Sequence, residues 1–395
     1  MQICADIPTH FIFQENSKNT QVYHLKAIRK DTIMEQIKNF TRGMGIGGWL
    51  TNFKRYHVIP EDKRQDLTIG DFEHFDSYIT EWDVKNIADM GFDHIRVCFD
   101  QIVVEESAYK YREYTYKLLE DFAMWCRKYD LGVVFNLHNS IGSNCAIAED
   151  VSLLESDELR ARFVAFWVAF EKRFSHMPEI MFELQNEVRD TPTPEKWNSL
   201  YKSTIAAIRE LNPTRQIIVG AVAWGNCNNL KHLEILDDKY VYYTFHMYDP
   251  FEFTHQQGVL QPHTLYYNRK LEYPCDDIDR YRDYHKLFGN NEAYRDIERI
   301  DKEVLRKSLK GAVDFVKEHP DKVLWNGEFG TIRHIKTEYR ANYMRDVISI
   351  CRENGIPYSV WNYLSTPNDG NRFSLVDDDT REILSEDLLK ALLGE

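Results

Sequence analysis

The sequence predicts an α/β protein, a (β/α)8 TIM barrel with a loop subdomain inserted after the sixth strand and with an N-terminal extension. From residue 43 onward, short β-rich runs alternate with longer segments of helical periodicity, which is typical of repeated βα units around a parallel sheet. Several of these runs, such as VVFNL and IIVG, are almost continuously apolar, which indicates strands covered on both faces.

The strands and helices follow from this alternation. Eight strands are expected, over residues 44–49, 94–99, 132–138, 180–186, 216–221, 240–246, 323–329 and 358–361. Helices are expected over residues 81–90, 114–129, 157–174, 194–211, 302–318, 339–354 and 385–393, with a shorter one over 230–236. Thr193 and Pro194 form an N-terminal helix signal, and the run NGIP from Asn354 forms a C-terminal stop.

The domain organisation is predicted to be simple. An N-terminal extension covers residues 1–42, and one catalytic barrel covers residues 43–395, because no linker rich in Ser, Gly or Pro divides it. An insertion over about residues 249–300 follows the sixth strand and is rich in Tyr, His, Asp and Arg. A loop of this length at the C-terminal face of a barrel is expected to shape the active site.

Composition excludes several classes of protein. A net charge of −14 disfavours nucleic acid as a partner, because phosphate binding needs a concentrated basic face. No basic segment followed by a long apolar run opens the chain and no stretch is long enough to span a membrane, so a cytoplasmic location is expected. The seven cysteines are scattered without CxxC pairing, which predicts free thiols and neither a zinc site nor a disulfide framework.

Polar side chains stand at or near the predicted C-terminal ends of the strands, where barrels of this kind carry their functional groups. These candidates are Arg96, His138, Asn186, Glu187, His246, Tyr248, Glu328 and Trp361. Each alone has an ordinary structural explanation, but their concentration at one end of one barrel predicts a single site.

Glu187 and Glu328, which follow the fourth and seventh strands, are predicted to meet across the mouth of the barrel. Two carboxyl groups about 5 to 5.5 Å apart perform two-step glycoside hydrolysis with retention, in which one acts as acid and base and the other as nucleophile. A nucleophile must stay ionised, and Arg96 and Tyr248 are the expected donors to Glu328. Glu187 is therefore the expected acid/base, and Asn186 beside it is placed to hold the sugar 2-hydroxyl.

At these residues the chain resembles glycoside hydrolase family 5, the cellulase-type branch of the retaining (β/α)8 glycosidases. The segments that carry the resemblance are GMGIGGWL, FDHIRVCFD, GVVFNLHN, MFELQNEV, YYTFHMYDPFEFTHQ, LWNGEFG and YSVWNY, in the family's order over residues 43–363. The resemblance implies that all eight candidates are active-site residues, with Glu187 as acid/base, Glu328 as nucleophile and Trp361 as a floor for the sugar before the cleaved bond.

Two departures from the family's pattern concern substrate contacts. Val188 stands where many members of the family have proline, and Asn139 stands where many have a second histidine after His138. The insertion resembles a subdomain found after the sixth strand in some bacterial members. The first 42 residues resemble nothing identifiable.

The expected function is that of a retaining β-glycosidase on β-1,4-linked gluco- or manno-configured substrates. Without a visible export signal or binding module, an intracellular β-mannosidase-type enzyme on short oligosaccharides is the first hypothesis, and an endo-β-1,4-glucanase is the alternative. An inert carbohydrate-binding barrel is disfavoured because both carboxylates are present. A metal-dependent hydrolase is disfavoured because GIGGW near the first strand offers no ligands, so neither metal nor cofactor is expected.

Overall fold

The structure is a computed structural model that describes residues 39–51, 67, 69–143, 152–189, 194–259, 262–366 and 369–395. Of the predicted N-terminal extension, residues 1–38 lie outside the described residues. The division of the chain into an extension and one barrel domain stays a prediction.

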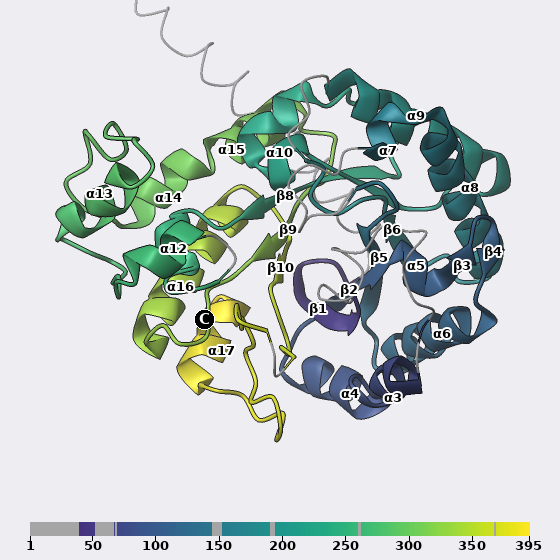
Figure 1. The fold of residues 1–395 in the computed structure, drawn as a ribbon, viewed down its shortest axis with the longest axis horizontal. Helices are drawn as coiled ribbons and strands as arrows, with labels where there is room; N and C mark the ends of the chain where they lie inside the picture. Colours follow the sequence, from purple (N-terminus) through teal and green to yellow (C-terminus); the bar gives the residue numbers. More distant parts are fainter. Residues whose placement is uncertain are drawn as a thin grey trace, which may run out of the picture.

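Eight parallel strands close into a barrel in the order β1-β10-β9-β8-β7-β6-β5-β2, as the alternating pattern predicts. The strands are β1 (Arg42–Leu50), β2 (His94–Asp100), β5 (Gly132–Asn139), β6 (Ile180–Glu183), β7 (Ile217–Gly220), β8 (Val241–Met247), β9 (Leu324–Phe329) and β10 (Tyr358–Val360). A small antiparallel pair, β3 (Glu105–Ser107) and β4 (Lys110–Tyr111), lies outside the barrel sheet. Figure 1 shows the helices as a ring around the strands.

The long helices match the predicted positions to within a few residues. They are α4 (Glu81–Asp89), α6 (Glu113–Lys128), α8 (Asp157–Phe174), α9 (Pro194–Leu211), α14 (Lys302–Ser308), α15 (Lys310–Glu318), α16 (Thr337–Glu353) and α17 (Glu386–Leu393). Shorter helices are α3 (Ile69–Ser77), α5 (Gln101–Val104), α7 (Ser152–Glu155), α10 (Val222–Gly225), α11 (Phe251–Thr254), α12 (Pro262–Tyr267), α13 (Ile278–Lys286) and the 3-10 helix η2 (Cys227–His232).

Three sequence predictions of extent were wrong. The helix expected over 302–318 is two helices that meet at Leu309, where the Ser308 carbonyl accepts a hydrogen bond from Cys227 Sγ at 3.1 Å. In place of a helix over 230–236, η2 ends at His232. The strand expected over 180–186 ends at Glu183, because the chain leaves the regular ladder before it reaches Glu187, whose φ is 39°.

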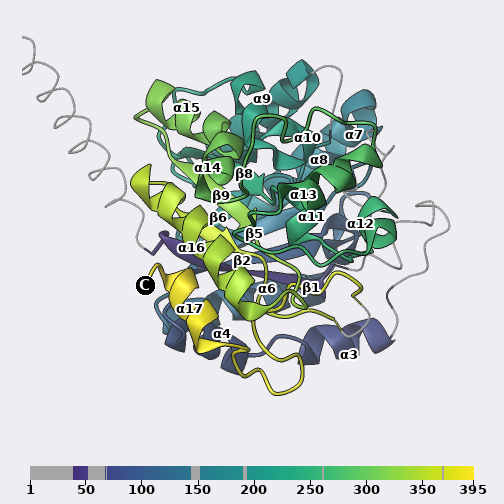
Figure 2. The same cartoon turned by 90° about the vertical axis from the view of Figure 1, so that its left-hand side faces the viewer.

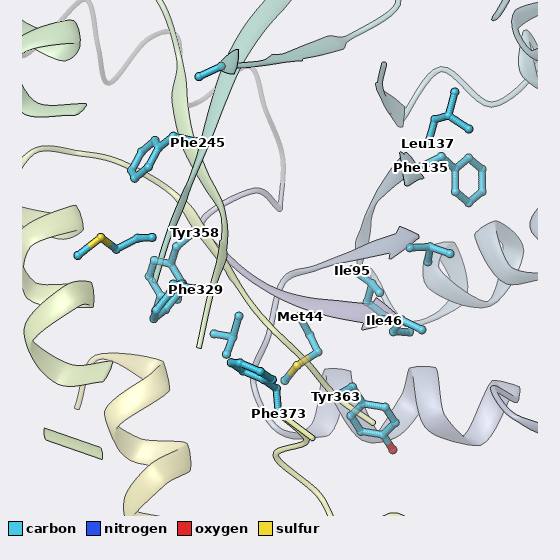
Figure 3. Packing of buried hydrophobic residues seen from close by; sticks show 14 of the residues in the cluster. Met44, Ile46, Ile95, Phe135, Leu137, Phe245, Phe329, Tyr358, Tyr363 and Phe373 are labelled. Atoms are coloured by element: carbon cyan, nitrogen blue, oxygen red, sulfur yellow. The ribbon is translucent and has the colours of Figure 1, made fainter. Parts of the chain in front are cut away.

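Apolar side chains fill the space between the strands and the surrounding helices. The main core cluster contains outward-facing strand residues such as Ile46, Ile95, Phe135 and Phe329, and Figure 3 shows several of them packed around the strands. Burial of this area is the principal favourable term for folding. It also explains the continuous apolar runs, since these strands are covered outside by helices and inside by the barrel interior.

The interior of the barrel changes character along its axis. At the N-terminal end of the strands a second cluster contains Phe40, Val134, Met181, Ile218, Tyr242, Val323 and Trp325. The Phe40 ring lies 4.7 Å from that of His94 and 5.2 Å from that of Trp325, between centroids. A Cβ on Gly43 would come within 2.2 Å of the His94 ring, so a glycine is required there in β1. This apolar end leaves the opposite end of the barrel for polar groups.

The segment between β8 and β9 carries α11, α12 and α13, and Figure 1 shows α12 and α13 on one side of the barrel. Buried hydrogen bonds hold this segment in place. Glu252 accepts from Tyr294 at 2.7 Å and lies 3.1 Å from His285, and Tyr273 donates to Asp346 of α16 at 2.7 Å. In Figure 2 the short helices α7, α10, α11 and α12 lie toward one end of the molecule, beyond the strands that precede them.

None of the helices in the described ranges is both long and apolar enough to cross a membrane. The cysteines in those ranges, Cys98, Cys126, Cys227, Cys275 and Cys351, are buried free thiols as predicted. Cys4 and Cys145 lie outside the described residues. The cytoplasmic location stays a prediction.

Candidate active site

Arg96 organises the polar end of the barrel. It lies on β2, is completely buried, and spreads its guanidinium hydrogen bonds over three elements. Nε donates to Glu183 Oε2 at 2.6 Å, and Nη2 donates to Glu183 Oε1 and to Asn186 Oδ1, both at 2.8 Å. Nη1 donates to Glu328 Oε1. Burial would lower the pKa of Arg96, but Glu183, Cys98 and Glu328 together raise it well above its usual value, so the group stays charged.

Glu187 and Glu328 come together as predicted. One oxygen of each carboxylate and a ring nitrogen of His246 all lie within 4.8 Å of one another. His246 Nδ1 is 2.9 Å from Glu187 Oε1 and 3.6 Å from Glu328 Oε2, so the imidazole bridges the pair. This is the short spacing that permits direct attack on an anomeric carbon, and it is too short for the intervening water of an inverting enzyme.

The two carboxyl groups differ in their surroundings. The Glu328 side chain is 6% exposed and accepts hydrogen bonds from Arg96 and from the Tyr248 hydroxyl, the latter at 3.0 Å. Burial and the Glu328 charge raise the pKa of Tyr248 well above its usual value, so it remains a phenol and a donor. The Glu187 side chain is 21% exposed and is bonded to His246. Glu328 is therefore the more enclosed carboxyl group, bonded to a cation and a phenol, and Glu187 is the more exposed one.

The hydrogen bond between His246 and Glu187 depends on the protonation of the imidazole. Burial lowers its pKa, but the carboxylates of Glu328 and Glu187 outweigh this effect and raise it above 6.5. The ring therefore binds a proton more readily than a free histidine would, and a protonated ring donates to Glu187.

Glu187 adopts a left-handed backbone conformation, with φ at 39°, which costs a non-glycine residue on the order of 1–3 kcal/mol. Its neighbours hold it there. Asn186 N donates to Leu137 O of β5 at 2.9 Å, and Val188 O accepts from Trp224 N at 3.0 Å. The chain on either side of Glu187 is thus bonded to β5 and to the segment after β7, and these bonds direct the carboxylate toward Glu328.

Trp361 and His138 form an aromatic wall of the site. Their rings are parallel within 2°, with centroids 5.9 Å apart, and a ring nitrogen of His138 lies within 4.8 Å of a Glu328 oxygen. The glycines of GMGIGG make room for the indole, since a Cβ on Gly47 would come within 2.3 Å of it. With this contact, all eight predicted candidates belong to one site.

Two residues of the site were not predicted. Glu183 is fully buried, and the signal for it was an acidic residue at the end of the apolar run IMF. Trp224 is 45% exposed and follows β7 on a left-handed segment, with φ of 56°, 57° and 72° at Ala223, Trp224 and Gly225. Its indole lies 5.8 Å from the Arg189 guanidinium. Only the glycine at 225 hinted at this turn in the sequence.

Two groups in the described part of the chain have metal-compatible spacing: Cys98, His138 and Glu328, and Glu187, His246 and Glu328. Both depend on Glu328, whose oxygens already accept from Arg96 and Tyr248. A cation bound there would compete with the guanidinium for the same carboxylate, so these donors fit an ion pair better than a metal site.

Comparison with known proteins gives a consistent match. The family model "Cellulase (glycosyl hydrolase family 5)" matches residues 62–366. Endoglucanase C from Acetivibrio thermocellus is 33% identical over 362 residues, which cover 90% of this chain and 98% of that protein. Cellodextrinase A from Ruminococcus flavefaciens is 30% identical over 233 residues, 58% of this chain and 64% of that protein.

Solved structures share the fold. Endoglucanase Cel5A from Thermotoga maritima superposes with a TM-score of 0.69 and 23% identity, over 91% of this chain and 99% of that chain. A hyperthermophilic endo-β-1,4-glucanase in complex with substrate superposes with a TM-score of 0.68, over 92% and 99%. The closed parallel barrel, the family model across most of the chain and the full-length relative agree, and the chain belongs to glycoside hydrolase family 5.

Proposed function

We propose that this glycoside hydrolase is a retaining endo-β-1,4-glucanase in which Glu328 is the nucleophile and Glu187 is the acid/base. The observation that carries the proposal is the carboxylate pair at the barrel mouth, with one oxygen of each residue within 4.8 Å. A pair this close favours double displacement through a glycosyl-enzyme.

The first step begins with substrate in the subsite floored by Trp361. An oxygen of Glu328 forms a bond to the anomeric carbon while the glycosidic bond breaks, and Glu187 gives its proton to the departing oxygen. Asn186 supports this step, because its Nδ2 is buried, has no hydrogen-bond partner in the described part of the chain and is available to a sugar hydroxyl. The hydrogen bonds from Arg96 and Tyr248 orient the Glu328 carboxylate for attack.

In the second step Glu187 accepts a proton from water, the water oxygen bonds to the anomeric carbon, and Glu328 leaves as a carboxylate. His246 bridges both carboxyl groups through the cycle. Because its pKa is raised by the two carboxylates, it supplies a donor to Glu187 after the proton has left that residue.

The substrate assignment rests on the relatives. The cellulase family model and the full-length relative named endoglucanase C favour a β-1,4-glucan over the β-mannoside that was the first hypothesis from sequence. An exposed indole on the acid/base side supports endo action. Trp224 N bonds to Val188 O, so α10 lies beside the group that protonates the leaving sugar, and an aromatic face there suits a further sugar unit.

The experiment is product analysis on matched gluco- and manno-oligosaccharides. Reduced cellopentaose and mannopentaose are incubated with the enzyme, and early products are separated by chromatography. Internal cuts in cellopentaose, with slower or no cleavage of mannopentaose, are expected. Release of glucose alone from cellopentaose would overturn endo action, and preference for mannopentaose would overturn the glucan assignment and return the β-mannosidase hypothesis.

A further inference from the structure

Glu183 is a buried acid in the site with no step of the reaction assigned to it. It ends β6, four residues before Glu187, and is 0% exposed. Both of its oxygens accept from Arg96, at 2.6 and 2.8 Å. A buried carboxylate is costly unless it is paired, so its retention beside the catalytic pair requires an explanation.

The guanidinium of Arg96 is divided between two carboxylates. Glu183 accepts from Nε and from one N–H of Nη2 in a bidentate pair, whereas Glu328 accepts from Nη1 alone. The other Nη2 bond goes to Asn186. A planar guanidinium held at two edges presents its third edge in one direction, so Glu183 sets where the Nη1 donor meets Glu328. Through its two bonds Glu183 also compensates positive charge of Arg96 that would otherwise act on Glu328.

We propose that Glu183 is a positioning residue that tunes the nucleophile, by aiming Arg96 at Glu328 and by compensating enough of its charge to keep Glu328 reactive. The proposal rests on the double displacement proposed above. An uncompensated arginine would bind the Glu328 carboxylate more tightly and make it a weaker nucleophile, but a better leaving group. The two chemical steps should therefore respond to Glu183 in opposite directions.

The variant Glu183→Gln tests this directly, because it removes the charge and keeps the shape. On cellotetraose, where bond cleavage with a poor leaving group limits turnover, kcat is expected to fall about tenfold or more, with KM within about threefold. On 2,4-dinitrophenyl β-cellobioside, where release of the glycosyl-enzyme limits turnover, kcat is expected to stay level or rise. A loosened site would slow both steps.

The pH profile supplies a second readout. Without Glu183, the acidic limb of kcat/KM is expected to move to lower pH, because the positive charge of Arg96 is then opposed by one carboxylate fewer. The other titratable groups that face Glu328 are the same in both proteins: Cys98 from β2, His138 from β5, Glu187 after β6, and His246 and Tyr248 from β8 and the residue after it. The shift therefore reports on the Arg96 charge.

The chain offers a matched control. Arg215 and Glu171 form a second fully buried pair, with Nε and Oε2 at 2.6 Å, and Arg215 also bonds the carbonyls of Phe174, Met177 and Ile180 near the start of β6. Glu171→Gln removes the same charge away from the site and should leave the acidic limb and the ratio of the two steps unchanged. Glu183→Asp keeps the charge and should restore the acidic limb.

The outcomes separate the two proposals. If a folded Glu183→Gln enzyme keeps wild-type rates on both substrates, or loses both equally with an unmoved acidic limb, the role of Glu183 is overturned. If that variant does not fold, Glu183→Asp decides, because it keeps the charge but shortens the reach. An acidic limb displaced from that of wild type would overturn the charge compensation, and wild-type kcat on cellotetraose would overturn the aiming of Arg96. Labelling of wild-type enzyme by a 2-fluoro cellobioside tests the nucleophile separately: label outside Glu328 would refute the proposed function itself.

Discussion

Glu187 and Glu328 are the same residue type in one site, and their neighbours separate their roles. Glu328 has a cation and a phenol as donors and is nearly inaccessible, whereas Glu187 is more exposed and bonded to His246. An acid must exchange protons with substrate and water, and a nucleophile must remain an anion. Environment therefore distinguishes the two carboxyl groups where residue type does not, and it supports the proposed roles.

Removal of each carboxylate has a distinct signature. Glu187→Ala should reduce kcat by about 10²–10⁴ for poor leaving groups and much less for dinitrophenyl glycosides, because only the former need a proton. Azide should partly restore turnover on the activated substrate and yield a β-glycosyl azide. Glu328→Ala should have no measurable turnover. If azide instead gave a β-glycosyl azide with Glu328→Ala and an α-glycosyl azide with Glu187→Ala, the roles would be exchanged.

The short segments after the strands are the elements that adapt this barrel to a substrate. The segment Val222–Gly225 after β7 has two consecutive non-glycine residues in the left-handed region, which is energetically costly. Gly225, at φ 72°, packs on the His246 ring: a Cβ at this position would lie 3.2 Å from His246 Cγ. Trp224 on this turn is 45% exposed, and its indole lies 5.8 Å from the Arg189 guanidinium. The conformation of the turn is held by the bond from Trp224 N to Val188 O.

Trp224→Ala is expected to lower kcat/KM for cellopentaose about tenfold, or roughly 1.4 kcal/mol, because a sugar on the leaving-group side loses an aromatic face. Hydrolysis of an aryl cellobioside, which has no sugar on that side, should change little. Trp82→Ala on α4 is the matched control, since Trp82 is also about half exposed, at 54%, but lies on the outer ring of helices. Equal losses on both substrates would contradict this placement of Trp224.

For the molecule as a whole, the inserted segment and the barrel loops share a buried aromatic contact that depends on pH. The His255 ring stacks on Phe251, with centroids 3.9 Å apart, and also contacts Tyr248 and Phe373. Burial lowers the pKa of His255 from 6.5 to about 3. The unfolded chain therefore binds a proton at His255 below pH 6.5, and the folded chain does not until about pH 3.

Stability should accordingly fall as the pH drops from 6.5 toward 3, by about 1.4 kcal/mol per pH unit from this residue. His255→Gln removes that contribution, so between pH 6.5 and 5 the variant should lose about 2 kcal/mol less than wild type in denaturant unfolding. His232→Gln, at an exposed histidine of η2, is the control for any general effect of replacing a histidine. Parallel curves for His255→Gln and wild type would refute the assignment.

Much of the fold could be read from the chain because its signals are local. Apolar runs and helical periodicity are properties of neighbouring residues, and the barrel strands and long helices appeared where they predicted, as with α8 over Asp157–Phe174. The break between α14 and α15 was not predicted. Beside the break, the Ser308 carbonyl accepts a hydrogen bond from Cys227, 81 residues away, and a contact at that separation leaves no local sequence signal. The early end of β6 was not predicted for a similar reason. Bonds to β5 and to the segment after β7 hold Glu187 in its strained conformation, and both segments are distant in sequence.

The sequence by itself determined the barrel and the family, and it named the eight side chains that the structure brings together, since each lies in a strand or within a few residues after one and the strand ends converge on one face. Only the tertiary structure decided how the groups of the site divide their bonds: Arg96 is shared between Glu183 and Glu328, His246 bridges the two carboxylates, and Trp224 N bonds to Val188 O. The reason is physical. Position along a strand is a local property, whereas hydrogen-bond partnership depends on distances between segments that only closure of the barrel brings together.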